Sequence, residues 1–323
     1  MNLETTESST VPLGAAPPGA VLTGERFVPS WRRFKGLAIF TGLVVLAFAK
    51  PLFVLLTFAP HAELYSHILL IPFISGYLIW MKRGEVVLES EPNRRMALLP
   101  LAAGALLLAG YWMALRRGWT FAKPDYLAVT MLAFVLFLMV GGFLFIGAKY
   151  FKSIAFPAVF LFFCVPFPQF VRDGIETFFQ RGSAETAYLM LRASGMSVLK
   201  TGTHFQMPAF SLDVAPQCSG IHSSLVLLIT SLLAAHMFLQ TPSRKVLFTL
   251  SVIPLALLRN GFRIFTISEL CVHVGPQMID SPIHHHGGPL FFLLSLVPLF
   301  LLLVYLTKSE ARKEHAMAVR RKN

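Results

Sequence analysis

The amino-acid sequence predicts an all-α membrane protein, a polytopic bundle of about eight transmembrane helices. Three observations carry this prediction. Hydrophobic residues make up 55% of the 323-residue chain and charged residues only 14%, whereas soluble domains are roughly one-quarter charged. The apolar residues form runs long enough to cross a bilayer. Basic residues, which give a net charge of +12, stand mainly between these runs, as they do in membrane proteins.

Residues 1–34 form the first predicted segment, a disordered cytoplasmic tail. The segment is rich in Ser, Thr, Pro and Gly and shows no apolar periodicity. It is too long for a cleavable signal peptide, and no basic stretch begins it. The transmembrane domain is predicted over residues 35–307, and residues 308–323 form a basic tail that is also assigned to the cytoplasm.

Apolar runs within residues 35–307 are the candidate spans. The first begins at about Gly36 and is interrupted at Lys50-Pro51, where the helix either ends or lets the Lys50 side chain reach the interface. The third span is the least regular, because Arg116 and Arg117 follow it on the side that holds few other basic residues. The spans after the first are predicted at about 66–81, 96–115, 125–147, 153–171, 218–239, 246–268 and 287–307.

The distribution of basic residues predicts the orientation. Positively charged loops mark the cytoplasmic side. With eight spans, the basic residues before the first span and after every second span all lie on one side, together with both chain ends. Because this accounts for the positive charge, nothing in the sequence indicates nucleic-acid binding. The basic residues are Arg32, Arg33, Lys35, Lys82, Arg83, Arg94, Arg95, Lys149, Lys152, Arg244, Lys245, Lys308, Arg312, Lys313, Arg320, Arg321 and Lys322.

The long segment 172–217 lies on the outer side in this topology. Its first part has apolar residues at helical spacing, and its last part, from Thr203 to Val214, has an extended pattern. The segment is therefore predicted to contain an amphipathic helix and an extended stretch that can form a hairpin against the bundle.

Residues that can carry chemistry stand at the outer ends of the last three spans. Cys218 opens the sixth span, where a helix N-terminus favours the thiolate. Arg259 and Arg263 occupy the outer half of the seventh, and an intramembrane Arg can bind an oxyanion. The His run 284–286 precedes the eighth and can transfer protons near neutral pH. Since the three helices alternate in direction, we expect these groups to converge at the outer face.

Each group also has a plain structural interpretation. A lone Cys is often an inert buried residue, and Cys164, inside an apolar run, is predicted to be one. The Arg263 side chain can extend to the lipid headgroups, which Arg259, one turn deeper, does less easily. The His run can be a solvated loop.

Metal binding and a disulfide are two further alternatives. The three consecutive His, with His67 and His273, can be considered as zinc ligands. Against this, no H-E-x-x-H motif is present, and adjacent His residues point in different directions. A Cys218–Cys271 disulfide is conceivable in an oxidising compartment, and it would remove the nucleophile.

Several motifs together resemble the exosortase/archaeosortase family of membrane-embedded cysteine transpeptidases. The segment 214–221, VAPQCSGI, is similar to the family's nucleophile motif, and 260–263, NGFR, to its arginine motif. His284, followed by Gly288 and Phe291, is similar to its histidine motif. The resemblance covers about residues 60–305. A further signature near the N-terminus is matched by Tyr65, Ser66, His67, Pro72, Tyr77, Leu78 and Trp80.

This resemblance implies a catalytic triad of Cys218, Arg263 and His284, with no cofactor and no metal. The thiolate of Cys218 would form an acyl-enzyme, Arg263 would stabilise the oxyanion or position the carbonyl, and His284 would move the protons. Two departures leave questions open. His222 stands where many members carry Arg, so its role and the substrate subfamily stay open. The three-His run leaves His286 as an alternative base.

The resemblance also implies the partners and the location. The substrates would be exported proteins with a C-terminal sorting signal, composed of a short motif, a transmembrane helix and a basic tail. The enzyme would sit in the cell's inner membrane as a multi-pass protein, with its active site near the outer face. The recognition motif, the acceptor (an amine or water) and the oligomeric state stay open. So do two other function classes, a transporter or channel with Arg259 and Arg263 along an anion path, and a zinc-dependent membrane hydrolase.

Overall fold

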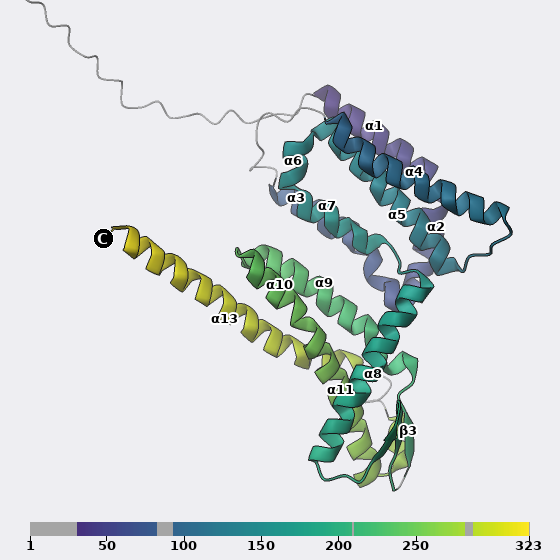
Figure 1. The fold of residues 1–323 in the computed structure, drawn as a ribbon, viewed down its shortest axis with the longest axis vertical. Helices are drawn as coiled ribbons and strands as arrows, with labels where there is room; N and C mark the ends of the chain where they lie inside the picture. Colours follow the sequence, from purple (N-terminus) through teal and green to yellow (C-terminus); the bar gives the residue numbers. More distant parts are fainter. Residues whose placement is uncertain (1–30, 83–92, 209, 282–286, 323) are drawn as a thin grey trace, which may run out of the picture.

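Helices make up nearly the whole structure, and one small sheet lies at one end of it (Figure 1). The computed structural model describes residues 31–82, 93–208, 210–281 and 287–322. Residues 1–30 of the predicted tail lie outside the described residues, and the first helix begins at Trp31. The predicted all-α membrane fold is confirmed.

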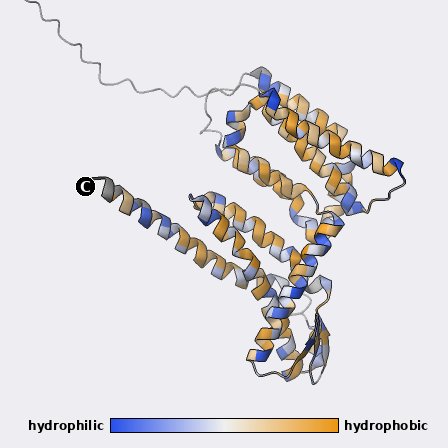
Figure 2. Cartoon of the chain, in the orientation of Figure 1, coloured by the Kyte–Doolittle hydropathy of each residue, from blue (hydrophilic) through white to orange (hydrophobic). Residues whose placement is uncertain are grey.

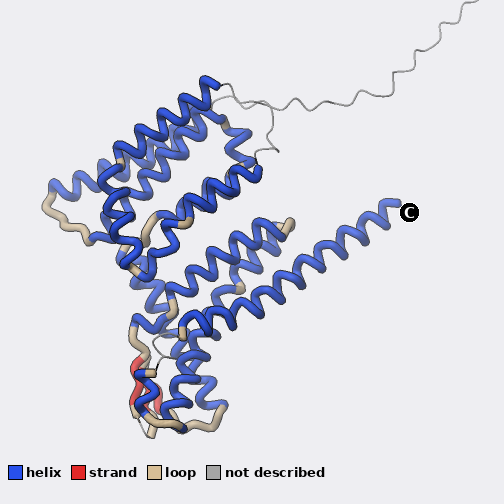
Figure 3. The backbone as a smooth tube through the Cα atoms, turned by 180° about the vertical axis from the view of Figure 1, so that it is seen from behind, coloured by secondary structure: helices blue, strands red, loops and turns tan. Residues whose placement is uncertain are grey.

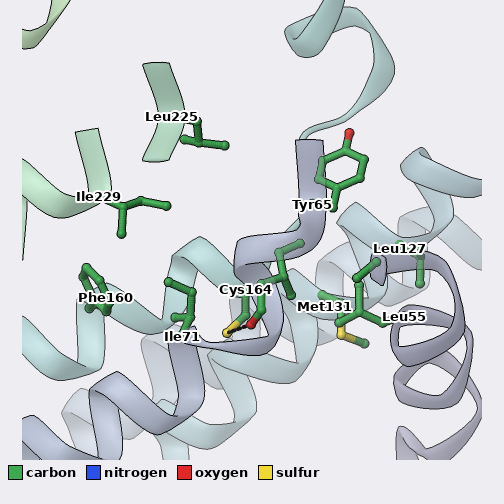
Figure 4. Close-up of a cluster of buried hydrophobic side chains, with 11 residues drawn as sticks. Leu55, Tyr65, Ile71, Leu127, Met131, Phe160, Cys164, Leu225 and Ile229 are labelled. Atoms are coloured by element: carbon green, nitrogen blue, oxygen red, sulfur yellow. Dashed lines mark hydrogen bonds between the residues drawn. The ribbon is translucent and has the colours of Figure 1, made fainter. Parts of the chain in front are cut away.

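The N-terminal half is a group of helices around a shared apolar core. Side chains from α2, α3 and α5 pack there against Phe160 and Cys164, and Leu225 and Ile229 of α9 join them from the C-terminal half (Figure 4). The helices of this group are α1 (Trp31–Ala47), α2 (Ala49–Phe58), α3 (Ile71–Met81), α4 (Arg94–Arg116), α5 (Lys123–Gly141), α6 (Ala148–Ser153) and α7 (Ala155–Phe160). Short turns complete it: η1 (Ala59–His61), η2 (Glu63–Leu69), η4 (Gly142–Ile146) and η5 (Leu161–Cys164).

The C-terminal half is a second group, and α8 (Gln169–Ala193) connects the two (Figure 1). The carboxylate of Glu310 holds the helices of this second group together at one end. It accepts hydrogen bonds from the backbone N–H groups of Gln240 (3.0 Å) and Thr241 (2.9 Å). The group contains η6 (Pro216–Ser219), α9 (Ile221–Phe238), α10 (Pro242–Leu250), α11 (Val252–His273), η7 (Pro276–Asp280) and α13 (Gly288–Lys322).

The predicted extended stretch forms a three-stranded antiparallel sheet at the far end of α8 and α11 (Figure 3). The strands are β1 (Leu199–Thr201), β2 (His204–Gln206) and β3 (Ser211–Asp213), in the order β1-β2-β3. Phe205, at the centre of β2, is fully buried in a cluster with residues of α8 and with Ile264 of α11. The helix and hairpin predicted for the outer segment are both present.

The number of spans agrees with the prediction of about eight. Six helical segments are long and apolar enough to cross a membrane, and two bent helix pairs raise the number to eight if each pair is one span. Most of the helices consist largely of hydrophobic residues, whereas α8 carries many hydrophilic residues (Figure 2). The chain is therefore a multi-pass helical membrane protein.

The bends lie where the sequence contains helix-breaking residues. The first pair bends by 68° at Phe48, close to the predicted interruption at Lys50-Pro51. The fifth span, predicted as one helix over 153–171, differs in the structure. Its helix ends at Cys164 and resumes at Gln169 after a bend of 93°. Pro166 and Pro168, in the intervening segment, disfavour the helical conformation of the residues before them.

Candidate functional site

Cys218 lies in η6, a single 3-10 turn between the sheet and the N-terminus of α9. Gly220 ends this turn with φ +71°, a left-handed conformation that other residues rarely adopt. A Cβ at Gly220 would also lie 3.1 Å from the Asn260 side chain and 3.2 Å from Arg259 Nη2. Only glycine therefore suits both the backbone and the space, and the chain places Cys218 just before a helix N-terminus, as predicted.

The carbonyl oxygen of Gly220 is the hydrogen-bond acceptor that holds this turn in position. It accepts hydrogen bonds from the Ser224 N–H (3.0 Å), Ser224 Oγ (2.7 Å) and Ser223 Oγ (3.1 Å), all from the first turn of α9. It also accepts one from Arg259 Nη2 of α11, at 3.2 Å. The position of the Cys218 turn is thus fixed by two helices at once.

Arg259 is buried at this junction, with 8% of its surface exposed. Besides the Gly220 carbonyl, its Nη2 contacts Ser224 Oγ at 3.2 Å. A buried guanidinium is stable in an apolar region only when it is hydrogen-bonded. Arg259 therefore joins the first turn of α9 to the middle of α11, and the expected convergence of these two groups is present.

Arg263, one turn further along α11, lines a groove of about 180 Å³ beside the sheet. Asn260 lies on the same side of the helix, and the groove continues along the chain to Ala215, three residues before Cys218. The carbonyl of Val214 is held by Gln180 of α8, whose Nε2 donates to it at 2.5 Å. The groove lining is Ser211, Leu212, Asp213, Val214, Ala215, Asn260, Arg263, Ile264, Ile267 and Ile279.

The N-terminal signature contacts the first turn of α9, which follows the Cys218 turn. Ser66 Oγ, in η2, is 3.4 Å from Nε2 of His222, which belongs to the first turn of α9. Tyr65 is buried, and its hydroxyl donates to the Phe167 carbonyl at 3.3 Å. Residues 156 positions apart in the sequence thus meet at the start of α9, and η2 connects the N-terminal half to the site.

The predicted histidine run 284–286, His284 included, lies outside the described residues. His273 pairs with Glu269 one turn before it, at 3.1 Å. Within the described part of the chain, no three His, Cys, Asp or Glu side chains are grouped so that they could hold a metal ion.

The other two cysteines have the surroundings of structural residues. Cys164 is a free, buried thiol in the core of the N-terminal half, which confirms the prediction. Cys271 is also a free thiol and is 1% exposed in α11. The alternative of a Cys218–Cys271 disulfide is therefore wrong for this structure.

Two contributors to the site do not stand out in the sequence. Gln180 is one polar residue among many on the amphipathic α8, and Ser224 is one of several serines in α9. Their roles depend on which helix face meets the Cys218 turn. The only sequence signal for Ser224 is its position four residues after Gly220, which puts its hydroxyl within reach of that carbonyl.

Comparison with protein families places the chain in a known family. The model of a family described as "Transmembrane exosortase (Exosortase_EpsH)" matches residues 59–301, well over half of the chain. This range contains η2, the Cys218 turn, the α11 arginines and the beginning of α13. No curated protein and no solved structure matches the chain.

Proposed function

Because the chain belongs to the transmembrane exosortase family, we propose that it is a thiol peptidase/transpeptidase of the membrane. It cleaves the C-terminal sorting signal of exported proteins through an acyl-enzyme on Cys218. The signal consists of a short motif, a transmembrane helix and a basic tail. The enzyme lies in the inner membrane with both tails in the cytoplasm, so that the Cys218 turn is near the outer face.

The observation that supports this proposal best is the setting of Cys218. The turn precedes a helix N-terminus, whose positive end favours a thiolate. It is fastened on both sides, by Arg259 through the Gly220 carbonyl and by Gln180 through the Val214 carbonyl. A nucleophile works best when its backbone is rigid and its surroundings are preorganised. A groove lined by Arg263 extends to Ala215, the residue before this turn.

In the proposed reaction the Cys218 sulfur attacks the carbonyl carbon of the scissile peptide bond. The carbonyl oxygen becomes an oxyanion, which the planar guanidinium of Arg263 stabilises. His284 takes the thiol proton and delivers it to the leaving amine, so that the C–N bond breaks and a thioester remains. An acceptor amine or water then attacks the thioester, gives up a proton to His284 and releases the thiol.

The test is the processing of a reporter protein that ends in such a signal, taken from an exported protein of the same genome. Cys218→Ala should insert normally and leave the reporter uncleaved, because it removes the nucleophile and little volume. Cys271→Ala, which changes a second free thiol in the same half of the protein, is the matched control and should retain cleavage. Cleavage by Cys218→Ala would exclude the peptidase mechanism. Loss of cleavage in a chelator with recovery in zinc would favour the zinc hydrolase instead.

A further inference from the structure

The groove beside Arg263 runs along the edge of β3. Side chains alternate between the two faces of a strand. Yet five consecutive residues, 211–215, all line this groove. Consecutive residues, three of them in β3 and two directly after it, line one groove when it follows the backbone edge of the strand. Since β2 occupies one edge of β3, the groove lies along the other, which faces α11.

The hydrogen bonds of the sheet show which backbone groups face this groove. Val214 N–H donates to the Thr203 carbonyl at 3.1 Å, and the Phe210 carbonyl accepts from Met207 N–H at 3.0 Å. Backbone groups in an antiparallel pair alternate between facing the partner and facing away from it. With this register, the N–H and C=O groups of Ser211 and Asp213 face away from β2, toward the groove.

We propose that an extended segment of the substrate binds in this groove as a further strand on β3 and is thereby led to Cys218. The inference rests on the proposed function and assigns the binding mode of the peptide at that site. An edge strand offers N–H and C=O groups at strand spacing, which an extended peptide complements whatever its sequence.

The position and lining of the groove support a peptide as the occupant. Beyond β3 the groove continues along Val214 and Ala215, and the Cys218 turn begins at the next residue, Pro216, so a strand bound there would extend toward this turn. Alternate side chains of the peptide would meet apolar residues such as Leu212, Ile264 and Ile267. Within the described residues, Arg263 is the cation that lines the groove, and in the proposed reaction it is the group that stabilises the oxyanion.

The opposite edge of the sheet is the natural control. β1 is also an outer strand, but the residues that line the groove do not include any of its own. Leu199 of β1 and Ser211 of β3 are both exposed, so a reporter group placed at either one samples its own edge of the same sheet.

A photo-crosslinking experiment tests the binding mode independently of catalysis. The crosslinker p-benzoylphenylalanine replaces Ser211 or Leu199 in full-length Cys218→Ala protein, which is produced together with the sorting-signal reporter. Crosslinks from position 211 and only background from 199 are expected. Equal crosslinking from both edges, or none from 211, overturns the proposal. Crosslinking from 211 to a reporter that the wild type does not cleave would support the binding mode and contradict the proposed peptidase.

A pair of substitutions tests the backbone hydrogen bond itself. Ser211→Pro removes one N–H that faces the groove and leaves the bonds to β2, whereas Ser211→Ala keeps the N–H. Ser211→Pro should raise KM for the reporter about fivefold, the effect of one lost hydrogen bond, with kcat unchanged. Ser211→Ala, which lacks the same hydroxyl and keeps the N–H, is the reference for this comparison, and iodoacetamide should label Cys218 equally in both variants. An unchanged KM in a Ser211→Pro protein with normal labelling overturns the proposal.

Discussion

The two arginines of α11 differ in what their guanidinium groups contact. Arg259 is buried and bonds to Gly220 and Ser224, whereas Arg263 lines the groove. A Lys keeps the charge and loses the planar fork of donors. Arg263→Lys should therefore lower the rate of reporter cleavage about 100-fold, the typical effect of removing one oxyanion donor.

Arg259→Lys should have a milder effect on cleavage and a larger one on folding. Without the Arg259 guanidinium, the Gly220 carbonyl loses its hydrogen bond to α11, which should lower the free energy of unfolding by about 1–3 kcal/mol. Thermal unfolding in detergent, measured beside cleavage, distinguishes the two residues. If Arg263→Lys cleaved the reporter at the wild-type rate, the Arg263 side chain would serve only to reach the lipid headgroups. The oxyanion would then have no stabilising cation.

The histidines give a second prediction for single residues. His284→Ala should lose cleavage and slow the labelling of Cys218 by a thiol reagent at neutral pH, because the proposed base, which would favour its thiolate, is removed. His285→Ala should resemble the wild type, since adjacent side chains point in different directions, and His286→Ala should be intermediate. Activity in His284→Ala with none in His286→Ala would move the base by two residues.

His222 is the matched control for that series. It lies in the first turn of α9, four residues after Cys218, with its Nε2 3.4 Å from Ser66 Oγ. This contact links His222 of α9 to η2. Loss of thiol labelling in His222→Ala but not in His284→Ala would assign the base to His222 instead.

At the scale of secondary-structure elements, the site depends on how closely α8 and α11 pack. Gly261 of α11 meets α8 where an added Cβ would lie 2.6 Å from the Thr186 Cβ and 3.1 Å from the Ala187 backbone nitrogen. Such an approach between helices requires a small residue. Gly261 stands between Asn260 and Phe262 in the arginine motif, so the same contact sets the position of the groove-lining side chains.

Gly261→Ala should therefore destabilise the protein by about 1–3 kcal/mol, the usual effect of overpacking, and also reduce cleavage. Gly174→Ala is the control, because an added Cβ at Gly174 of α8 meets nothing within 4 Å. It should leave cleavage unchanged and stabilise α8 slightly, as Ala is the better helix former. The thermal unfolding midpoints of the two variants are compared in detergent. Equal midpoints would show that α8 and α11 accommodate the added methyl group and would contradict this prediction.

The elements also show what the sequence can and cannot predict. Apolar runs locate the spans, because the bilayer fixes their length and polarity. The meeting of the Cys218 turn with α11 follows from the alternating directions of the helices. The bond from Arg259 to Gly220 does not, since it depends on how each helix is rotated about its axis. The fifth span illustrates the same limit, because apolar composition continues past Cys164 while Pro166 and Pro168 end the helix.

At the scale of the whole molecule, the orientation is the prediction on which the outer site depends. The basic residues predict that both chain ends are cytoplasmic and that the sheet lies outside. An exception to the charge pattern is Arg116, whose guanidinium stacks on Trp112 at 4.2 Å, an arrangement suited to a membrane interface. The charge of Arg116 therefore does not require a cytoplasmic position.

Reporter fusions test this orientation. A fusion at Asn323 should report the cytoplasm, and an insertion at Gly202, in the turn between β1 and β2, should report the outer compartment. Gly202 suits an insertion because it is exposed in the turn that connects the two strands. The same side for both would contradict the placement of Cys218 near the outer face.

The hydrogen bond between Arg259 and the Gly220 carbonyl also determines when the site can form during synthesis of the chain. The two residues are 39 positions apart, and a ribosome adds about 5–20 residues per second. Arg259 is therefore synthesised roughly two to eight seconds after Gly220. Until α11 has inserted, the Gly220 carbonyl lacks the hydrogen bond from Arg259, and the groove lacks the α11 residues that line it. Cys218, the proposed nucleophile, is therefore synthesised early, and the site in which it would act is completed late.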